Sequence, residues 1–314
     1  MSQDNEKKQE NIIKDYKLRR SLHAYTSHRE RSYKSHANRV QRLNRSVQTI
    51  RDLGFRITEV NNLKQSHVKA LVEHWKENNI STAEIKNRMT DMRWLAEKIG
   101  KQNMIPRTNR ELGIEDRKMP GNEINRAVTR SQEDLARISD DCTRMSLRAQ
   151  ELFGLRKKES IMLNIKRDYD EKNGVLRLQD RGSGTKGGRP REIPIRNDEQ
   201  KQYLIEAKNF QSDRGLRAFI GKKYDGSDRN LKEQMNVYDK NCERAELSNN
   251  HGLRHHYAQE RYEELTGWKC PRQGGKTFAD MTPEERLQDH EARMIVSAEL
   301  GHGREYVTRT YLGR

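Results

Sequence analysis

Residues 251–255, His-Gly-Leu-Arg-His, decide how this sequence is interpreted, together with three other stretches. Upstream, residues 153–159 read Phe-Gly-Leu-Arg-Lys-Lys-Glu, and residues 185–191 read Thr-Lys-Gly-Gly-Arg-Pro-Arg. Downstream, residues 300–302 read Leu-Gly-His, and Tyr311 follows nine residues after this histidine. In a chain with 35% charged residues, each stretch alone carries little weight, because isolated arginines and lysines are usually solvated. Their order and spacing are informative together.

The basic residues of these stretches suit the binding of a phosphodiester. Attack on phosphorus adds negative charge to the non-bridging oxygens, and guanidinium groups meet that charge with planar donors that stay ionised. Arg156 and Arg254 are the candidates for this role. Lys186, in the glycine-rich turn, is the candidate general acid that protonates the leaving 5′-hydroxyl.

The tyrosine and the histidines complete a reactive set. A phenol has a pKa of about 10, so Tyr311 needs a base or a strongly positive site before it can act as a nucleophile. His251 is a candidate acceptor for the phenol proton, and His302 is a candidate hydrogen-bond donor to a phosphate oxygen. This scheme requires no metal ion or other cofactor. The competing interpretation of the histidines is local pairing on a helix.

In this order, the four stretches resemble the tyrosine recombinase (phage integrase) family. The resemblance implies that Tyr311 is the nucleophile rather than Tyr306, which lies four residues after His302. It also implies that Glu159 supports the first arginine and that His255 is the second histidine of the 251–255 box. The catalytic set that the resemblance implies is Arg156, Lys186, His251, Arg254, His302 and Tyr311.

The family's activity is then the expected activity of this chain. The resemblance implies a site-specific recombinase, the integrase of a mobile element, that forms a 3′-phosphotyrosyl intermediate without ATP. It implies a monomer or dimer on one double-stranded DNA site and a homotetramer on two duplexes joined by a Holliday junction. An accessory DNA-bending protein is a further partner of such systems. Two alternatives stay open: a type IB topoisomerase, and a DNA-binding regulatory or architectural protein that does not cleave.

Composition agrees with a nucleic-acid partner. The chain has 63 Lys plus Arg against 47 Asp plus Glu, a net charge of +16 and a pI near 9.7. Charge alone does not distinguish DNA from RNA or an anionic membrane. No stretch approaches the ~20 apolar residues of a membrane span, and the N-terminus lacks a signal-peptide pattern. Cys142, Cys242 and Cys270 share no metal-binding spacing and cannot all pair, so we expect a cytoplasmic protein. The resemblance implies association with the nucleoid, in a bacterial cell or another host cell of a phage or mobile element.

The pattern along the chain predicts a mainly α protein with two domains. Residues 1–30 are a basic arm, and residues 31–108 form a helical core-binding domain, with apolar stripes at three- and four-residue steps. Residues 109–122 are the linker, because Gly113, Pro120 and Gly121 interrupt the pattern. Residues 123–314 form an α+β catalytic domain, mostly helical with a small antiparallel sheet.

Within the second domain the sequence predicts a helix over 131–153 and strands over 164–170, 175–178 and 192–195. Lys186 then lies at a hairpin tip. Further helices are expected over 228–247, 252–265 and 283–300. Residues 274–277, Gly-Gly-Lys-Thr, imitate the end of a P-loop but lack its first glycine. Residues 266–290 separate the last two helices, and a contact with another protomer and a solvated loop are equally good interpretations of them.

Overall fold

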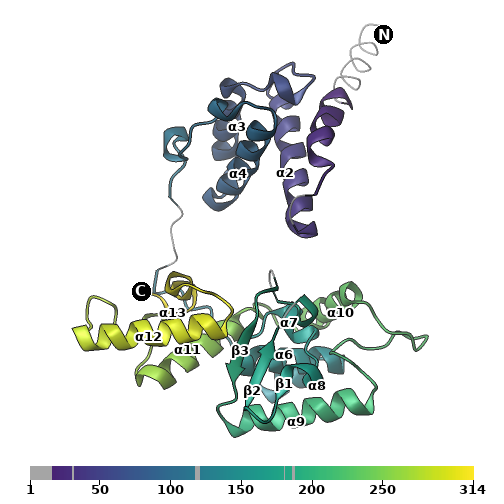
Figure 1. Cartoon of the computed structure of the whole chain (residues 1–314), viewed down its shortest axis with the longest axis vertical. Coiled ribbons are helices and arrows are strands. Elements are labelled where there is room, and N and C mark those ends of the chain that lie inside the picture. Colours follow the sequence, from purple (N-terminus) through teal and green to yellow (C-terminus); the bar gives the residue numbers. More distant parts are fainter. Residues whose placement is uncertain (1–15, 30–31, 117–120, 180, 186–187) are drawn as a thin grey trace. The chain divides into compact units, whose positions relative to one another are not determined.

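The protein is described by a computed structural model covering residues 16–29, 32–116, 121–179, 181–185 and 188–314. The chain divides into two compact units, residues 1–118 and 119–314. The fold is mainly helical with one small antiparallel sheet (Figure 1), as the sequence predicts.

The N-terminal unit is a small helical bundle. A helix over residues 16–26 is followed by α2 (Tyr33–Asp52), α3 (Gln65–Glu77) and α4 (Thr82–Lys98). Single 3-10 turns lie at Val60–Asn62, Gln102–Met104 and Arg110–Leu112. The predicted helical domain is therefore present, and the helix over 16–26 adds Leu18 and Leu22 to its core.

The apolar stripes of the sequence form most of this core. Buried side chains come from all the helices, among them Leu43, Val47, Ile50, Val68, Leu71, Trp75, Met89, Met92 and Leu95. Ser81 begins α4 by accepting a hydrogen bond from Glu84 N, and Gly54, with a φ of 90°, follows the end of α2. Asp91 is buried between Arg39 and Arg42, with Nε–O distances of 3.1 and 2.6 Å.

The C-terminal unit is built around α6 and α11. Its helices are α5 (Gln132–Ala136), α6 (Asp141–Phe153), α7 (Lys157–Ile161), α8 (Ile165–Asp168), α9 (Asp198–Asp213), α10 (Leu231–Arg244), α11 (Gly252–Thr266), α12 (Pro283–Glu299) and α13 (Arg309–Leu312). Further 3-10 turns lie at Arg181–Ser183, Pro271–Gln273 and Glu305–Thr308. α6 packs against α7, α9 and α11, and α11 also packs against α12 and α13. This packing brings segments that are far apart in the sequence to one place.

The sheet has three strands in the order β1-β2-β3, all antiparallel. β1 (Tyr169–Asp170) pairs with β2 (Val175–Leu178), and β2 pairs with β3 (Arg191–Pro194) in the register Leu178 to Arg191. Leu176, Leu178 and Ile193 face the core of the unit, where they join side chains of α6, α9 and α11. β3 also packs against α12.

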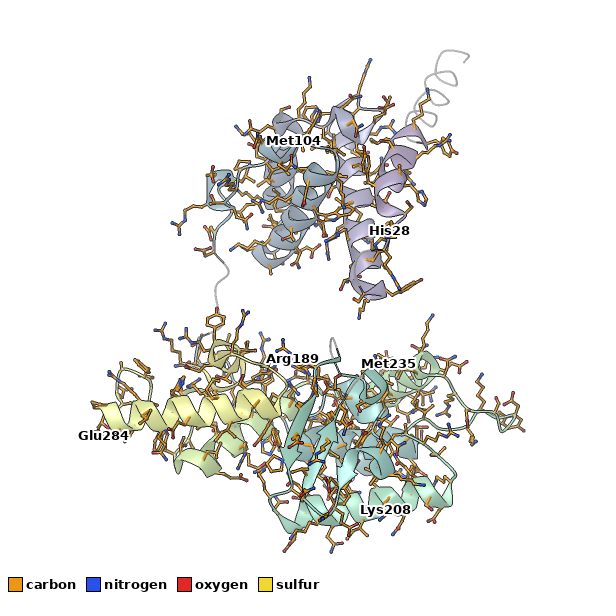
Figure 2. All side chains as sticks on the ribbon, viewed as in Figure 1. His28, Met104, Arg189, Lys208, Met235 and Glu284 are labelled. Atoms are coloured by element: carbon orange, nitrogen blue, oxygen red, sulfur yellow. The ribbon has the colours of Figure 1, made fainter. Side chains whose placement is uncertain are left out.

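Two expectations about elements need correction, and one helix was not expected. The strand expected over 164–170 is confined to its last two residues, because Asn164 accepts a hydrogen bond from Arg167 N at 3.1 Å and starts α8. The helix expected over 131–153 is interrupted, because Asp140 caps a new helix through Thr143 N. α9 was not predicted from the sequence. Charged side chains cover the outer faces of the elements, as Lys208 on α9 and Glu284 on α12 show (Figure 2).

Candidate active site

Arg156 follows a turn that requires glycine. α6 ends at Gly154, whose φ of 59° is in the left-handed region, and a Cβ there would lie 2.6 Å from the ring of Tyr257. The turn places Arg156 at the N-cap of α7, where its side chain is 23% exposed. Arg156 Nη2 donates to the carbonyl of Leu300 at 3.4 Å. The guanidinium is therefore anchored at one edge and accessible at another.

Glu159 is a fully buried carboxylate between two arginines. Arg156 Nη1 donates to Glu159 Oε1 at 2.7 Å, and the backbone N–H of Arg156 donates to Oε2 at 2.7 Å. From β3, Arg191 donates through Nη1 and Nη2 at 3.1 and 2.6 Å. Burial alone would raise the pKa of Glu159, but Arg191, Arg156 and Arg254 outweigh it and hold this pKa at about 2. The carboxylate thus stays ionised and orients both of the arginines that contact it.

Arg254 lies on α11 and is completely buried. Its Nη1 donates to the carbonyl of Gly154, and its Nη2 donates to the carbonyl of Leu300. Its Nε donates to the phenol oxygen of Tyr311 at 3.3 Å, and Nη2 lies 3.3 Å from His302 Nε2. Burial lowers the pKa of Arg254 to about 10, so the group stays charged at neutral pH.

Tyr311 lies on α13, a helix of four residues, and is only 5% exposed. Its hydroxyl is 3.3 Å from Arg254 Nε and 3.3 Å from His302 Nε2. Tyr306, by contrast, is 57% exposed, with Arg309 stacked on its ring. The structure therefore places Tyr311 among the predicted site residues and Tyr306 at the surface.

Three histidines surround the Tyr311 ring. The centroid of His255 lies 4.8 Å from that of Tyr311, and the centroids of His302 and His251 lie at 6.0 and 6.4 Å. Partial desolvation, and then the charges of Arg254 and Arg156, lower the pKa of His251. Burial and neighbouring positive groups lower that of His255 to about 4. Both rings are thus neutral at pH 7 and able to accept a proton.

The structure brings seven of the eight predicted residues together, and the eighth, Lys186, lies outside the described residues. Arg189, three residues later in the sequence, is exposed and lies beside Gly303. A Cβ atom at Gly303 would be 3.4 Å from Arg189 Nη1. Arg189 is labelled at the upper edge of the unit in Figure 2. Among the residues that the structure describes, no cluster of His, Cys, Asp and Glu has the geometry of a metal site.

Sequence reasoning missed Arg191, Gln259 and Arg272. Arg191 lies two residues before buried Ile193 on β3, so the two side chains share one face of the strand. This spacing was the available signal that Arg191 faces inward. Gln259 donates to the carbonyl of Tyr311 at 3.0 Å, and Arg272 donates to that of Arg309 at 3.5 Å. The sequence carries no comparable signal for these two, because they act on backbone atoms.

Comparison with known families assigns the class of the protein. The profile described as "Phage integrase, N-terminal" matches residues 16–105, and the profile described as "Integrase" matches residues 115–260. The chain is a member of the phage integrase family of tyrosine recombinases. It is a site-specific recombinase that breaks and rejoins DNA. No curated protein sequence matches the chain.

Solved structures share the fold at low sequence identity. A lambda integrase dimer bound to a COC′ core site has a TM-score of 0.59 at 13% identity, covering 94% of this chain and 76% of that one. The Tn1549 transposon integrase in complex with circular intermediate DNA has a TM-score of 0.55 at 17% identity, covering 94% and 95%. A lambda integrase tetramer bound to a Holliday junction has a TM-score of 0.56 at 14% identity, covering 93% and 77%. No described helix is long and apolar enough to cross a membrane.

Proposed function

We propose that Tyr311 attacks a DNA phosphodiester to give a 3′-phosphotyrosyl linkage and a free 5′-hydroxyl. The observation that carries this assignment is the position of the Tyr311 hydroxyl, 3.3 Å from both Arg254 Nε and His302 Nε2. A guanidinium at this distance can donate a hydrogen bond to the attacking oxygen. The new phosphotyrosyl bond preserves the energy of the broken one, so rejoining needs no ATP.

The two arginines are assigned to the phosphate. Arg156 has an accessible edge, and Glu159 fixes its orientation from behind, so its donors are in place before DNA arrives. Arg254 stabilises the charge that develops on the phosphoryl oxygens and on the attacking phenolate. Preorganised donors of this kind lower the barrier without reorganisation at the moment of reaction.

The proton transfers balance as follows. The phenol proton of Tyr311 passes to a neutral histidine. His302 Nε2 is within hydrogen-bonding distance of the Tyr311 hydroxyl. The expectation from the sequence was that His251 is the acceptor, and burial, which lowers its pKa, keeps the ring neutral as an acceptor must be. Lys186 supplies the proton to the leaving 5′-oxygen, an assignment that rests on the sequence and the family resemblance. In rejoining, the 5′-hydroxyl attacks the phosphotyrosine and each proton returns.

The solved structures of relatives support a proposal for the domains and the assembly. We assign residues 31–108, together with the helix over 16–26 that shares their core, to core binding, residues 109–122 to the linker and residues 123–314 to catalysis on the duplex. Because the matched lambda integrase structures are a dimer on a core site and a tetramer on a Holliday junction, we propose the same two states here. The chain would serve as the integrase of a mobile element in the bacterial cytoplasm, at the nucleoid, with a DNA-bending protein as an accessory factor.

The test is covalent capture of DNA. Suicide substrates made from the DNA that flanks the gene carry a nick, so that the cleaved end diffuses away and the protein stays attached. Tyr311→Phe is expected to abolish the SDS-resistant adduct while DNA affinity stays within about twofold, because no charge is lost. Tyr306→Phe is the matched control and is expected to form the adduct normally. An adduct with Tyr311→Phe but none with Tyr306→Phe would reverse the assignment.

A further inference from the structure

The helix that carries Tyr311 is too short to hold its own position. α13 has four residues, and an isolated helix of that length does not form in water. Its conformation therefore depends on the groups that hold its carbonyl oxygens. Those groups come from α11, α12 and the 266–290 segment.

Three side chains donate to the carbonyls of every second residue between 309 and 313. Gln259 Nε2 donates to the carbonyl of Tyr311 at 3.0 Å. Arg293 Nη1 donates to the carbonyl of Gly313 at 3.0 Å, and Arg272 Nη2 donates to that of Arg309 at 3.5 Å. All three side chains are buried.

Arg272 differs from the other two because it also holds the segment at the end of the linker. Its Nη1 donates to the carbonyl of Gly121 at 2.8 Å and to the carbonyl of Ile124. A single guanidinium thus joins residues 121–124 to α13, from a side chain that is 6% exposed. Only arginine offers a rigid fork with enough N–H groups for three carbonyls in different directions.

Two amide side chains strengthen the same connection. Asn122 Nδ2 donates to the carbonyl of Arg314 at 2.8 Å, and the N–H of Arg314 donates back to Asn122 Oδ1 at 3.0 Å. Asn125 and Gln259 are paired by two hydrogen bonds, at 2.8 and 3.3 Å. Gln259 is the residue that holds the Tyr311 carbonyl, so this pair also ends at the reacting tyrosine.

We propose that Arg272 is a positioning residue for Tyr311. In this role it couples the position of residues 121–125, at the end of the linker, to the position of α13, which carries the nucleophile. A displacement of residues 121–125 would move the carbonyl contacts of Arg272 and Asn122, and with them α13. This gives the 266–290 segment a function inside its own protomer, beside the two interpretations that the sequence left open. The inference rests on the assignment of Tyr311 as the nucleophile.

Arg272→Lys is the informative variant, because it keeps the positive charge and removes the fork. We expect the half-saturating DNA concentration to stay within about twofold. The single-turnover rate of adduct formation at saturating DNA should fall about ten- to a hundredfold, as expected for a nucleophile displaced by about 1 Å. Arg286→Lys is the matched control in the same segment, since Arg286 donates to the carbonyl of Phe278 and stacks on its ring. Its cleavage rate should equal that of the wild type.

Hydrogen exchange distinguishes positioning from a general loss of structure. In Arg272→Lys, amide exchange should accelerate in peptides covering 305–314 and 121–127, while α6 and α9 keep their protection. Faster exchange throughout the unit, or adduct formation at the wild-type rate, would overturn the proposal. If Arg272→Lys does not fold, Asn122→Ala decides: slower cleavage with the same local exchange supports the coupling, and wild-type behaviour overturns it. An adduct with Tyr311→Phe would instead refute the assignment of the nucleophile.

Discussion

Replacing Glu159 by glutamine tests whether the buried carboxylate organises the site. The substitution keeps the shape of the side chain but removes the negative charge between Arg156 and Arg191, whose side chain is 3% exposed. The pKa of Glu159, held at about 2 against an ordinary 4.5, corresponds at ~1.4 kcal/mol per pH unit to roughly 3 kcal/mol of folding free energy. Loss of one partner of a buried ion pair typically costs about 3–5 kcal/mol, which agrees.

The expected readout is the thermal unfolding of the C-terminal unit at pH 7. For a unit of this size, 1 kcal/mol shifts Tm by roughly 2–4 °C, so Glu159→Gln should lower Tm by about 6–12 °C. Glu192→Gln is the matched control. Glu192 lies on β3, its side chain is 60% exposed, and it pairs with Arg177 on β2. A pair of this kind contributes about 0–1 kcal/mol, so its loss should shift Tm by no more than a few degrees.

The pH dependence has a definite sign. A carboxyl group whose pKa is lowered by folding adds stability that is complete above its unfolded pKa and is lost as the pH falls through the folded pKa. The advantage of the wild type over Glu159→Gln should therefore shrink by about 1.4 kcal/mol between pH 7 and pH 3.5. A difference in Tm below about 2 °C at pH 7, or one that does not decrease with acid, would refute the reasoning.

Two further predictions concern catalysis and binding. Arg254→Lys should lower the rate of adduct formation by about 10²- to 10³-fold in a single-turnover assay, because an ammonium group cannot hold two carbonyls and the phenol together; a near-normal rate would remove Arg254 from the site. DNA affinity should fall by about 10³- to 10⁵-fold between 50 and 200 mM salt if six to ten phosphates are contacted, and a titration that shows no dependence on salt would contradict binding to the DNA backbone.

The sequence predicted the side chains of the site better than the framework that holds them. Arg254 and Tyr311 were predicted as site residues because each residue type suits the expected chemistry and each lies at a fixed spacing from a recognisable neighbour. The structure brings the two side chains within 3.3 Å of each other. Arg272 was not found, because its partners are carbonyl oxygens and every residue has one. Contacts of this kind depend on the tertiary path of the chain.

The elements show the same division between local and tertiary information. The stripes that end at Trp75 and Ile99 were predicted because their spacing of three and four follows one face of a helix. The break in the helix expected over 131–153 was missed, although Asp140 is a favourable N-cap, because no periodicity marks it. Short strands such as β1 carry little periodic signal, so the boundary at Tyr169 could not be placed.

The contacts of Arg254 show that the sequence stretches around Gly154 and Leu300 also contribute through their backbone. The carbonyls of Gly154 and Leu300 hold the guanidinium, so these two apolar positions take part in the site through their main chain. Grafting Arg254, His302 and Tyr311 onto another scaffold would therefore transfer the side chains without the backbone carbonyls that orient Arg254. A substitution at exposed Arg189 should disturb the backbone less than one at Gly154, where a side chain would meet Tyr257, although only Arg189 carries a charge.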